Sequence, residues 1–244
     1  MEAKRILVFG ATGGIGGALS RRLRARGDRL ALSARGAERG EALASELDAP
    51  FFEADVTAAG EVERVAKEAH EALGGLDGVA LCVGSILLKP AHLVRDAEWD
   101  ETLALNLTAA FRVVRAAGKQ MAKEGGSVVL FSTTAAQVGL PNHEAIAAAK
   151  AGVDGLVRSA AATYASRGLR FNAVAPGLVK TPLAEHLTSR DEARKASIAM
   201  HPLGRLGEPE EVAGVAAWLL SDEASWVTGQ TIAIDGGISR VRPR

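Results

Sequence analysis

The feature that most constrains the fold is a regular alternation of short apolar runs with longer segments of helical period. The apolar runs have the length of β-strands and are continuously hydrophobic, as at 6–9, 128–131 and 169–175. The segments between them repeat apolar residues every three or four positions, as in Ile15 and Leu19. Strands that are apolar throughout are typical of a parallel sheet buried on both faces, so the alternation predicts an α/β protein.

The apolar runs are expected to be strands of one sheet, and the segments between them helices. The predicted strands are 6–9, 30–32, 51–54, 78–83, 128–131, 169–175 and 231–234, and the predicted helices include 15–25, 42–47, 62–73, 99–121, 147–165 and 210–220. Right-handed crossovers then give a doubly wound Rossmann fold, with a seven-stranded parallel sheet and helices on both faces. We find no linker, repeat or low-complexity tract, so residues 1–244 are expected to form a single domain.

One segment breaks the alternation. Residues 178–206 contain Pro182, Pro202 and Gly204 among many polar residues. A long irregular segment after the carboxyl end of a strand is where a lid over a binding site lies in open α/β sheets. The segment is therefore predicted to be an irregular substrate lid.

Composition and charge exclude several classes of partner. Hydrophobic residues make up 48% of the chain, and Lys plus Arg equal Asp plus Glu at 29 each. Zero net charge gives no electrostatic reason to expect nucleic acid or a membrane surface as a partner, and no apolar run reaches the ~20 residues of a membrane span. A single cysteine, Cys82, rules out an intramolecular disulfide and fits a reducing compartment. Because no signal-peptide core follows Met1, a cytoplasmic location is expected.

A glycine-rich turn follows the first predicted strand and opens the first predicted helix. Residues without a Cβ let the backbone approach a pyrophosphate, and the amino terminus of a helix offers N–H groups to its charge. The turn is therefore predicted to bind a nucleotide, the alternative being a tight turn without a ligand. Its candidate binding residues are Gly10, Thr12, Gly13, Gly14, Ile15 and Gly16.

The same glycines carry a family resemblance. Gly10, Gly14 and Gly16 match the G-x-x-x-G-x-G of short-chain dehydrogenases/reductases, and with Gly13 they also match the G-x-x-G-x-x-G of longer relatives. The runs V-T-G-Q at 227–230 and I-D-G-G at 234–237 match the carboxyl-terminal signature of the single-domain branch. The chain resembles this branch over its whole length and is similar to members of the 3-oxoacyl-ACP reductase type. The resemblance implies a single NAD(P)-binding Rossmann domain.

The resemblance also implies where a nicotinamide cofactor binds. Asp55 and Val56 match the adenine-binding pair, and Gly84 is the residue retained from the N-N-A-G motif, which reads L-C-V-G here. Pro176, Gly177 and Thr181 match P-G-x-x-x-T, which holds the nicotinamide carboxamide in relatives.

The end of the second strand favours NADP(H) over NAD(H). Relatives that use NAD carry an acidic residue there for the ribose hydroxyls, and Ala34 cannot take that role. Arg35 can pair with a 2′-phosphate, with help from Arg39 or Ser33. The alternative is that Arg35 stacks on the adenine or faces solvent.

The catalytic centre of the family is retained only in part. Lys150 matches the lysine that binds the nicotinamide ribose, and Asn106 matches the asparagine that orders a water beside it. Aligned on Lys150, the catalytic serine position falls at Thr133, where neighbouring hydroxyl residues leave the register open by one. The catalytic tyrosine position is Ile146, which can neither donate nor accept a proton. General acid–base catalysis is typically worth ~10²–10⁴-fold, so another group is expected to supply the proton.

His143 is the candidate for that role. If a helix already runs there, His143 shares a face with Ile146 and Lys150; if it lies in a loop, it still borders the substrate pocket in this fold. Imidazole exchanges protons near neutral pH, and Glu144 could orient it or act itself. The alternative is that these residues form a helix cap and an exposed first turn. The only tyrosine, Tyr164, matches a structural position of the family.

Two functions are consistent with these residues. The first is an NADP-dependent oxidoreductase that interconverts a small-molecule carbonyl and alcohol without the catalytic tyrosine; the second is an NAD(P)-binding sensor or scaffold protein without turnover. Ile146 and the missing asparagines favour the second function, whereas the intact P-G-x-x-x-T favours the first. No metal site is predicted. The small residues Gly152 and Gly155, together with the resemblance, predict a homotetramer or homodimer.

Overall fold

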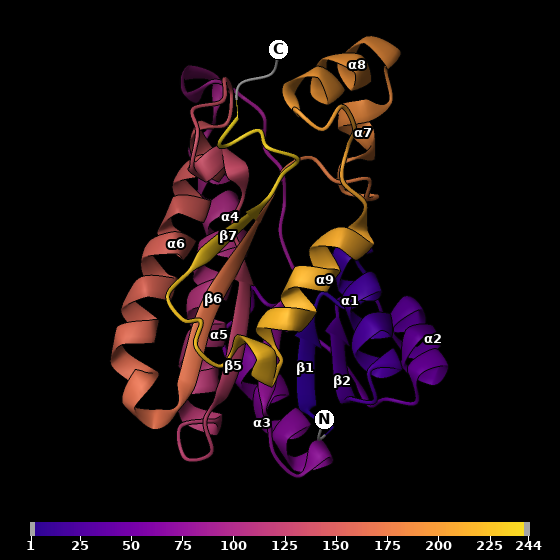
Figure 1. Ribbon diagram of the computed structural model, residues 1–244, viewed down its shortest axis with the longest axis vertical. Coiled ribbons are helices and arrows are strands. Elements are labelled where there is room, and N and C mark those ends of the chain that lie inside the picture. Colours follow the sequence, from indigo (N-terminus) through magenta and orange to yellow (C-terminus); the bar gives the residue numbers. More distant parts are fainter. Residues whose placement is uncertain (1–2, 242–244) are drawn as a thin grey trace.

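The computed structural model describes residues 3–241 (Figure 1). The apolar runs form one sheet in the order β3-β2-β1-β4-β5-β6-β7, with every neighbouring pair parallel. This is the predicted seven-stranded, doubly wound Rossmann fold, and its order reverses between β1 and β4, where such sheets bind ligands at the carboxyl ends of their strands. The strands are β1 (Arg5–Phe9), β2 (Arg29–Ala34), β3 (Phe51–Glu53), β4 (Gly78–Leu81), β5 (Gly126–Phe131), β6 (Leu169–Pro176) and β7 (Thr231–Ile234).

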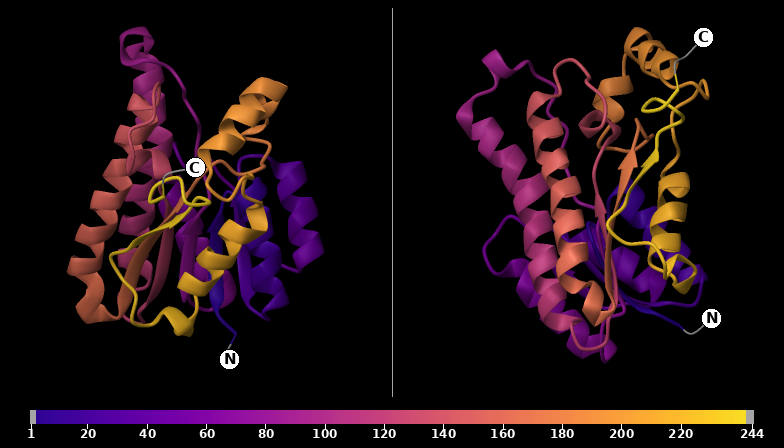
Figure 2. Two further views of the ribbon diagram at one scale, coloured as in Figure 1. Left: turned by 45° about the horizontal axis from the view of Figure 1, so that its top comes forward. Right: turned by 60° about the vertical axis from the view of Figure 1, so that its left-hand side comes forward.

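Helices connect the strands and cover both faces of the sheet. Helices α3, α5 and α6 pack on one face, and α1, α2 and α9 on the other (Figure 2). The helices are α1 (Gly14–Ala25), α2 (Ala37–Leu47), α3 (Glu61–Leu73), α4 (Asp96–Leu103), α5 (Ala109–Gln120), α6 (Glu144–Tyr164), α7 (Glu185–Thr188), α8 (Asp191–Met200) and α9 (Pro209–Leu219).

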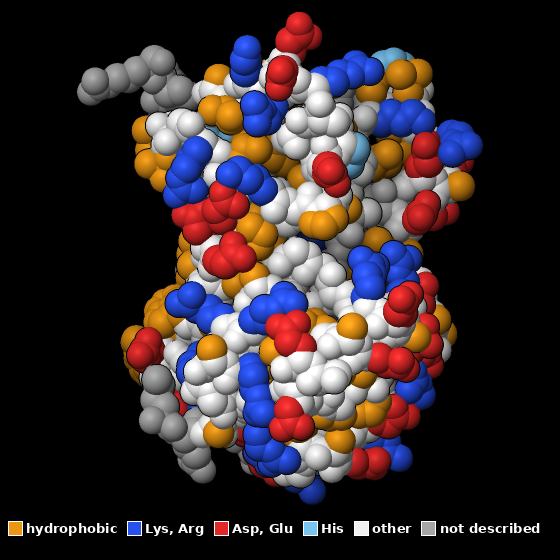
Figure 3. Space-filling view, turned by 90° about the vertical axis from the view of Figure 1, so that its right-hand side faces the viewer, with side chains coloured by type: hydrophobic (Ala, Val, Ile, Leu, Met, Phe, Trp, Pro, Cys, Tyr) orange, Lys and Arg blue, Asp and Glu red, His pale blue; other side chains and the backbone are white. Residues whose placement is uncertain are grey.

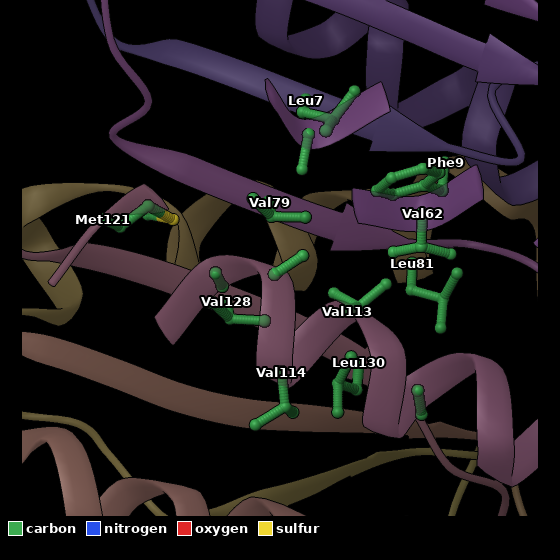
Figure 4. Close-up of a cluster of buried hydrophobic side chains, with 14 of the residues drawn as sticks. Leu7, Phe9, Val62, Val79, Leu81, Val113, Val114, Met121, Val128 and Leu130 are labelled. Atoms are coloured by element: carbon green, nitrogen blue, oxygen red, sulfur yellow. The ribbon is translucent and has the colours of Figure 1, made fainter. Parts of the chain in front are cut away.

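The two faces bury separate apolar clusters, because successive strand residues point in opposite directions. Leu7, Phe9 and Leu130 pack against α3 and α5 (Figure 4). Their neighbours Ile6 and Val8 pack against the helices on the opposite face. Fully burying a side chain of this size contributes about 1.5–3 kcal/mol, so the double layer holds the strand ends in fixed positions.

The predicted helix 99–121 is helical throughout residues 99–120, but it contains a π-helical turn that the sequence did not predict. Helix α4 ends at Leu103, a π-helical turn spans Ala104–Thr108, and α5 begins at Ala109. A π turn accommodates one extra residue and often lies at functional sites. Here it carries Asn106, which is 1% exposed.

The lid, residues 178–206, is less irregular than predicted. It contains α7 and α8, which stand at the top of the molecule beside the carboxyl ends of the strands (Figure 1). Its two ends pair with each other: Lys180 N donates to Gly207 O at 2.9 Å, and Gly207 N donates to Leu178 O at 3.0 Å. We call this pairing the stem of the lid. The lid therefore leaves and rejoins the body at one place.

Candidate active site

A cavity of about 330 Å³ lies where the sheet order reverses, between the glycine-rich turn, the end of β2 and the start of the lid. Figure 3 shows this side of the molecule hollowed below the lid. Predicted cofactor residues that line it are Gly10, Thr12, Gly13, Gly14, Ile15, Arg35, Val56, Gly84 and Thr181. Pro182 and Leu183 also line it, although the sequence had assigned them only to the lid.

The glycine-rich turn leaves room only for backbone. Gly10 has φ +73°, and a Cβ there would lie 2.8 Å from Cys82 O. A Cβ on Gly16 would lie 2.1 Å from Gly10 O. No side chain caps α1, so its first N–H groups are available to a ligand at the helix amino terminus. The turn therefore fits the pyrophosphate of a dinucleotide.

The residue after β2 and the first turn of α2 each bring an arginine to the same cavity. Arg35 and Arg39 both line it, beside Ser33. Ser33 is 1% exposed, and its Oγ has no hydrogen-bond partner among residues 3–241. A buried hydroxyl without a partner is costly unless a ligand or water bonds to it. These groups fit the adenosine half of a nicotinamide dinucleotide.

Asp55 does not line the cavity, whereas Ala54 and Val56 do. Its carboxylate accepts hydrogen bonds from Thr57 Oγ1 at 2.7 Å and Thr57 N at 2.8 Å. These bonds hold the pKa of Asp55 below its ordinary value. The side chain therefore fixes the loop after β3 and leaves Val56 at the cavity wall.

The predicted nicotinamide motif divides between two places. Thr181 lies over the glycine-rich turn, because a Cβ on Gly14 would meet Thr181 Cγ2 at 2.7 Å. Pro176 ends β6, and Gly177 N donates to Ile234 O at 3.1 Å. Gly177 lines a second cavity of about 490 Å³ rather than the first.

Lys150, Asn106 and Gly84 come together at the end of β4. A Cβ on Gly84 would lie 3.1 Å from Asn106 Oδ1 and 3.6 Å from Lys150 Nζ. The Asn106 amide donates to Ser85 Oγ at 2.9 Å and to Thr102 O at 3.0 Å, and its Oδ1 accepts from Ser85 N at 3.1 Å. Ser85 was missed from the sequence; its only signal was a hydroxyl directly after Gly84.

Lys150 is 7% exposed and donates from Nζ to Phe131 O at 2.7 Å. Burial lowers the pKa of Lys150 to about 8, against a smaller opposing effect of the Asp154 carboxylate. Ile146 lies one turn earlier on α6 and is 4% exposed. Lys150 is therefore an acid with a pKa close to neutral pH, beside an apolar wall.

Three consecutive hydroxyl residues follow β5, and two of them are engaged elsewhere. Ser132 Oγ donates to Lys150 O at 3.3 Å, and Thr134 Oγ1 donates to Asp235 Oδ2 at 3.0 Å. Thr133 Oγ1 accepts a long contact from Ala135 N, at 3.4 Å. Thr133 is half-buried, so of the three hydroxyls it has the most freedom to bind a ligand.

His143 lies outside the helix, directly before Glu144, the first residue of α6. Its Nδ1 lies 2.7 Å from Pro141 O, so Nδ1 carries the proton in the neutral ring and Nε2 is left to accept one. Asn142 O accepts from Lys89 N at 2.8 Å, which joins this loop to the loop after β4. His143 is therefore the cap residue of α6, before an exposed Glu144, as in the alternative of a helix cap and exposed first turn. A catalytic role for His143 stays a prediction.

Tyr164 lies at the far end of α6 and has a packing role. Its ring packs on Phe171, with ring centroids 5.5 Å apart, and its hydroxyl group lies over Gly118. Of the described residues, none form a group of three or more His, Cys, Asp or Glu able to hold a metal ion. Within residues 3–241, no helix is long and apolar enough to cross a membrane.

A parallel sheet with a glycine-rich turn, an uncapped helix amino terminus and basic side chains after β2 defines a dinucleotide-binding protein of the Rossmann class. Comparison with known proteins identifies the family within that class. Residues 10–239 match a family profile described as enoyl-(acyl carrier protein) reductase.

Relatives align along nearly the whole chain. D-threitol dehydrogenase of Mycolicibacterium smegmatis is 36% identical, over 97% of this chain and 93% of that protein. The 2,5-dichloro-2,5-cyclohexadiene-1,4-diol dehydrogenase of Sphingobium indicum is 35% identical, over 99% of each chain. The 3-oxoacyl-(acyl-carrier-protein) reductase FabG of Staphylococcus aureus is 34% identical, over 96% of this chain and 98% of that protein.

Solved structures of similar proteins support the same family assignment. A short-chain type dehydrogenase/reductase from Mycobacterium ulcerans superposes with a TM-score of 0.94 and 31% identity, covering 100% of this chain and 93% of that one. An actinorhodin polyketide ketoreductase solved with NADPH gives a TM-score of 0.92 and 30% identity, covering 98% and 97%. The chain therefore belongs to the short-chain dehydrogenase/reductase family, whose members are oxidoreductases of alcohol and carbonyl groups.

Proposed function

We propose that the protein is an NADP(H)-dependent oxidoreductase that interconverts a small-molecule carbonyl and an alcohol, with Ile146 in the position of the family's catalytic tyrosine. The observation that carries the proposal is the cluster at the end of β4. There a buried Lys150 of lowered pKa lies beside Gly84, which lines the cofactor cavity. We also expect the enzyme to be located in the cytoplasm.

Preference for NADP(H) is supported by the two guanidinium groups at the cavity. Arg35 and Arg39 would pair with a 2′-phosphate, and Ala34 offers no carboxylate to the ribose hydroxyls of NAD. We expect Arg35→Ser to raise the Kd for NADPH by roughly 10-fold or more and to leave the Kd for NADH within twofold. Titration of nicotinamide fluorescence measures both constants. Arg29→Ser, at the opposite end of β2, is the matched control, and equal weakening of both cofactors by Arg35→Ser would contradict the preference.

The chain's own residues supply orientation and the proton, while the cofactor, when bound, supplies or accepts a hydride. Thr133 Oγ1 would hold the substrate oxygen. Asn106 fixes the backbone of Ser85 at the cavity edge. Lys150 would bind the cofactor ribose. The proton would come from Lys150, whose pKa burial lowers to about 8, or from His143, directly or through a water.

Turnover on a panel of carbonyl substrates with NADPH tests the reaction. We expect His143→Ala or Lys150→Ala to lower kcat by at least ~10-fold, given the usual value of general acid catalysis. Lys67→Ala, on the solvent face of α3, is the control and should keep the wild-type rate. A measurable wild-type rate that neither substitution changes would show that the proton comes from elsewhere.

A second candidate function is a cofactor-binding sensor or scaffold without turnover. Two features favour it: Ile146 is buried beside Lys150, and Cys82 stands in the motif that carries asparagine in relatives. Burial raises the pKa of the Cys82 thiol to about 12, so it stays neutral. NADPH binding with no turnover on any substrate, unchanged in His143→Ala, would select this function.

A further inference from the structure

Asp235 directly follows β7 within the I-D-G-G signature, and its carboxylate is buried and fully engaged. It is 8% exposed. Oδ2 accepts hydrogen bonds from Thr134 Oγ1 and Ser239 N, both at 3.0 Å, and Oδ1 accepts from Gly237 N at 2.9 Å. Burial would raise the pKa of Asp235, but these hydrogen bonds outweigh it and hold the pKa below its ordinary value. The group is therefore a fixed anion at physiological pH.

One of those bonds reaches the turn that carries Thr133. Thr134 is 2% exposed and begins the 3₁₀ turn Thr134–Ala136, directly after Thr133. The carbonyl oxygen of Thr134 accepts from Gln137 N at 2.8 Å. Anchoring the Thr134 side chain therefore anchors both its own turn and the residue before it.

Asp235 also lies against Gly177, in the P-G-x-x-x-T segment that the family resemblance assigns to nicotinamide binding. The residue before it, Ile234, accepts a hydrogen bond from Gly177 N at 3.1 Å. A Cβ on Gly177 would lie 3.0 Å from Asp235 Cα. Asp235, directly after β7, thus lies against the segment after β6 and bonds to the turn after β5. Hydride transfer depends on the relative position of those two segments.

The structure assigns Asp235 and Thr134 as a positioning pair that holds Thr133 in register with the nicotinamide segment. The assignment rests on the proposed function, because Thr133 is taken as the hydroxyl that binds the substrate oxygen. Neither member of the pair is placed in contact with substrate. Both act through the position of Thr133.

Thr134→Val tests the pair, because it removes the hydroxyl and keeps the branched shape. We expect kcat to fall by roughly 10- to 100-fold while the Kd for NADPH stays within twofold, since displacement of a reacting group by about 1 Å has effects of this size. Thr134→Ser should recover most of kcat. Thr163→Val is the matched control, because its Oγ1 donates only within α6, to Ser159 O.

A double-mutant cycle shows whether the pair acts through Thr133. In a Thr133→Ala background, Thr134→Val should cause no further loss of kcat, because the group that it positions is already absent. A loss as large as in the wild-type background would overturn the assignment. So would a lower melting temperature with an unchanged kcat, which is the signature of a bond that only stabilises the fold.

Hydrogen exchange decides the assignment even if the protein has no turnover. The amides of Ala136, Gln137 and Val138 donate to carbonyls of the turn. They should exchange about tenfold faster or more in Thr134→Val and in Asp235→Asn, and at the wild-type rate in Thr163→Val. Wild-type exchange in both variants would overturn the positioning pair. Absence of turnover in the wild-type protein would contradict only the proposed function.

Discussion

Lys150 combines two properties that an exposed lysine does not have. Its Nζ donates to Phe131 O from a nearly closed environment, and burial lowers its pKa from 10.5 to about 8. At a pH between about 8 and 10.5, the Lys150 side chain is protonated in the unfolded chain and deprotonated in the folded chain. The free energy of unfolding should therefore rise as the pH increases through this range.

Comparison with Lys150→Met isolates this effect. Relative to that variant, the wild-type protein should gain roughly 3 kcal/mol of stability between pH 8 and 10.5, an upper value set by the full shift in pKa. Urea unfolding at several pH values measures the difference, and the Cys82 thiol, which both proteins share, cancels in the comparison. A difference between the two proteins that does not change with pH would contradict the lowered pKa.

Ile146 is the position at which a substitution is expected to raise the rate of the proposed reaction. Ile146→Tyr places a phenol one helical turn before Lys150, where the ammonium group favours ionisation of the hydroxyl. We expect kcat to rise by at least ~10-fold, within the usual value of general acid catalysis. Ile146→Val keeps the apolar wall and is the control. An Ile146→Tyr protein that binds NADPH normally but gains no activity would show that the rest of the site is not arranged for hydride transfer.

At the scale of elements, the π-helical turn between α4 and α5 has a defined role. It directs Asn106 inward, where the amide pairs with both the backbone and the hydroxyl of Ser85. Asn106→Leu keeps the volume but leaves Ser85 N–H without a partner. A loss of about 2–3 kcal/mol in the free energy of unfolding is expected, from the cost of buried unpaired polar groups. Urea unfolding measures it; Lys119→Ala, on the exposed face of α5, is the control and should change stability little.

The sequence alone was sufficient to predict features whose residues lie close together in the chain. The apolar runs predicted all seven strands, and the glycine-rich turn and Lys150 were found because each depends on neighbours within one turn or loop. The π turn was missed because the apolar period of 99–121 continues through it. The helices of the lid were missed because Pro182, Pro202 and Gly204 outweighed the acidic first turn of α8, at Asp191 and Glu192.

Contacts between distant residues were beyond a single sequence. Ser85 and Asn106 are 21 residues apart, and Thr134 and Asp235 are 101 apart. No local pattern requires either pair, since both follow from which strand ends become neighbours in the sheet. Most residues of the glycine-rich turn line one cavity because they share one βα turn, and their role in binding a cofactor stays a prediction. The identity of the proton donor could not be predicted from the sequence, because it depends on distances across the site.

At the scale of the whole molecule, the side of the body around β7 exposes large apolar side chains. Trp226 is 99% exposed and Leu203 is 69% exposed. Large exposed apolar side chains often mark an interface, and of the predicted homotetramer or homodimer we propose the tetramer. Light scattering should therefore give four times the monomer mass, and Trp226→Lys should reduce it to that of a dimer. Glu41→Lys, on α2 at the opposite edge of the sheet, should leave the tetramer intact, and a monomeric wild-type protein would contradict the proposal.

The stem of the lid has a consequence for how enzymes of this architecture diversify. Because Lys180 and Gly207 close the lid at its base, the intervening segment can be transplanted between homologues as a unit while the nucleotide platform stays constant. A chimera that carries another member's residues 184–206, and keeps the recipient's Thr181, Pro182 and Leu183 in the cofactor cavity, should acquire the donor's substrate range and keep the recipient's choice of cofactor. Recognition of the substrate and recognition of the nucleotide would then evolve as separate modules.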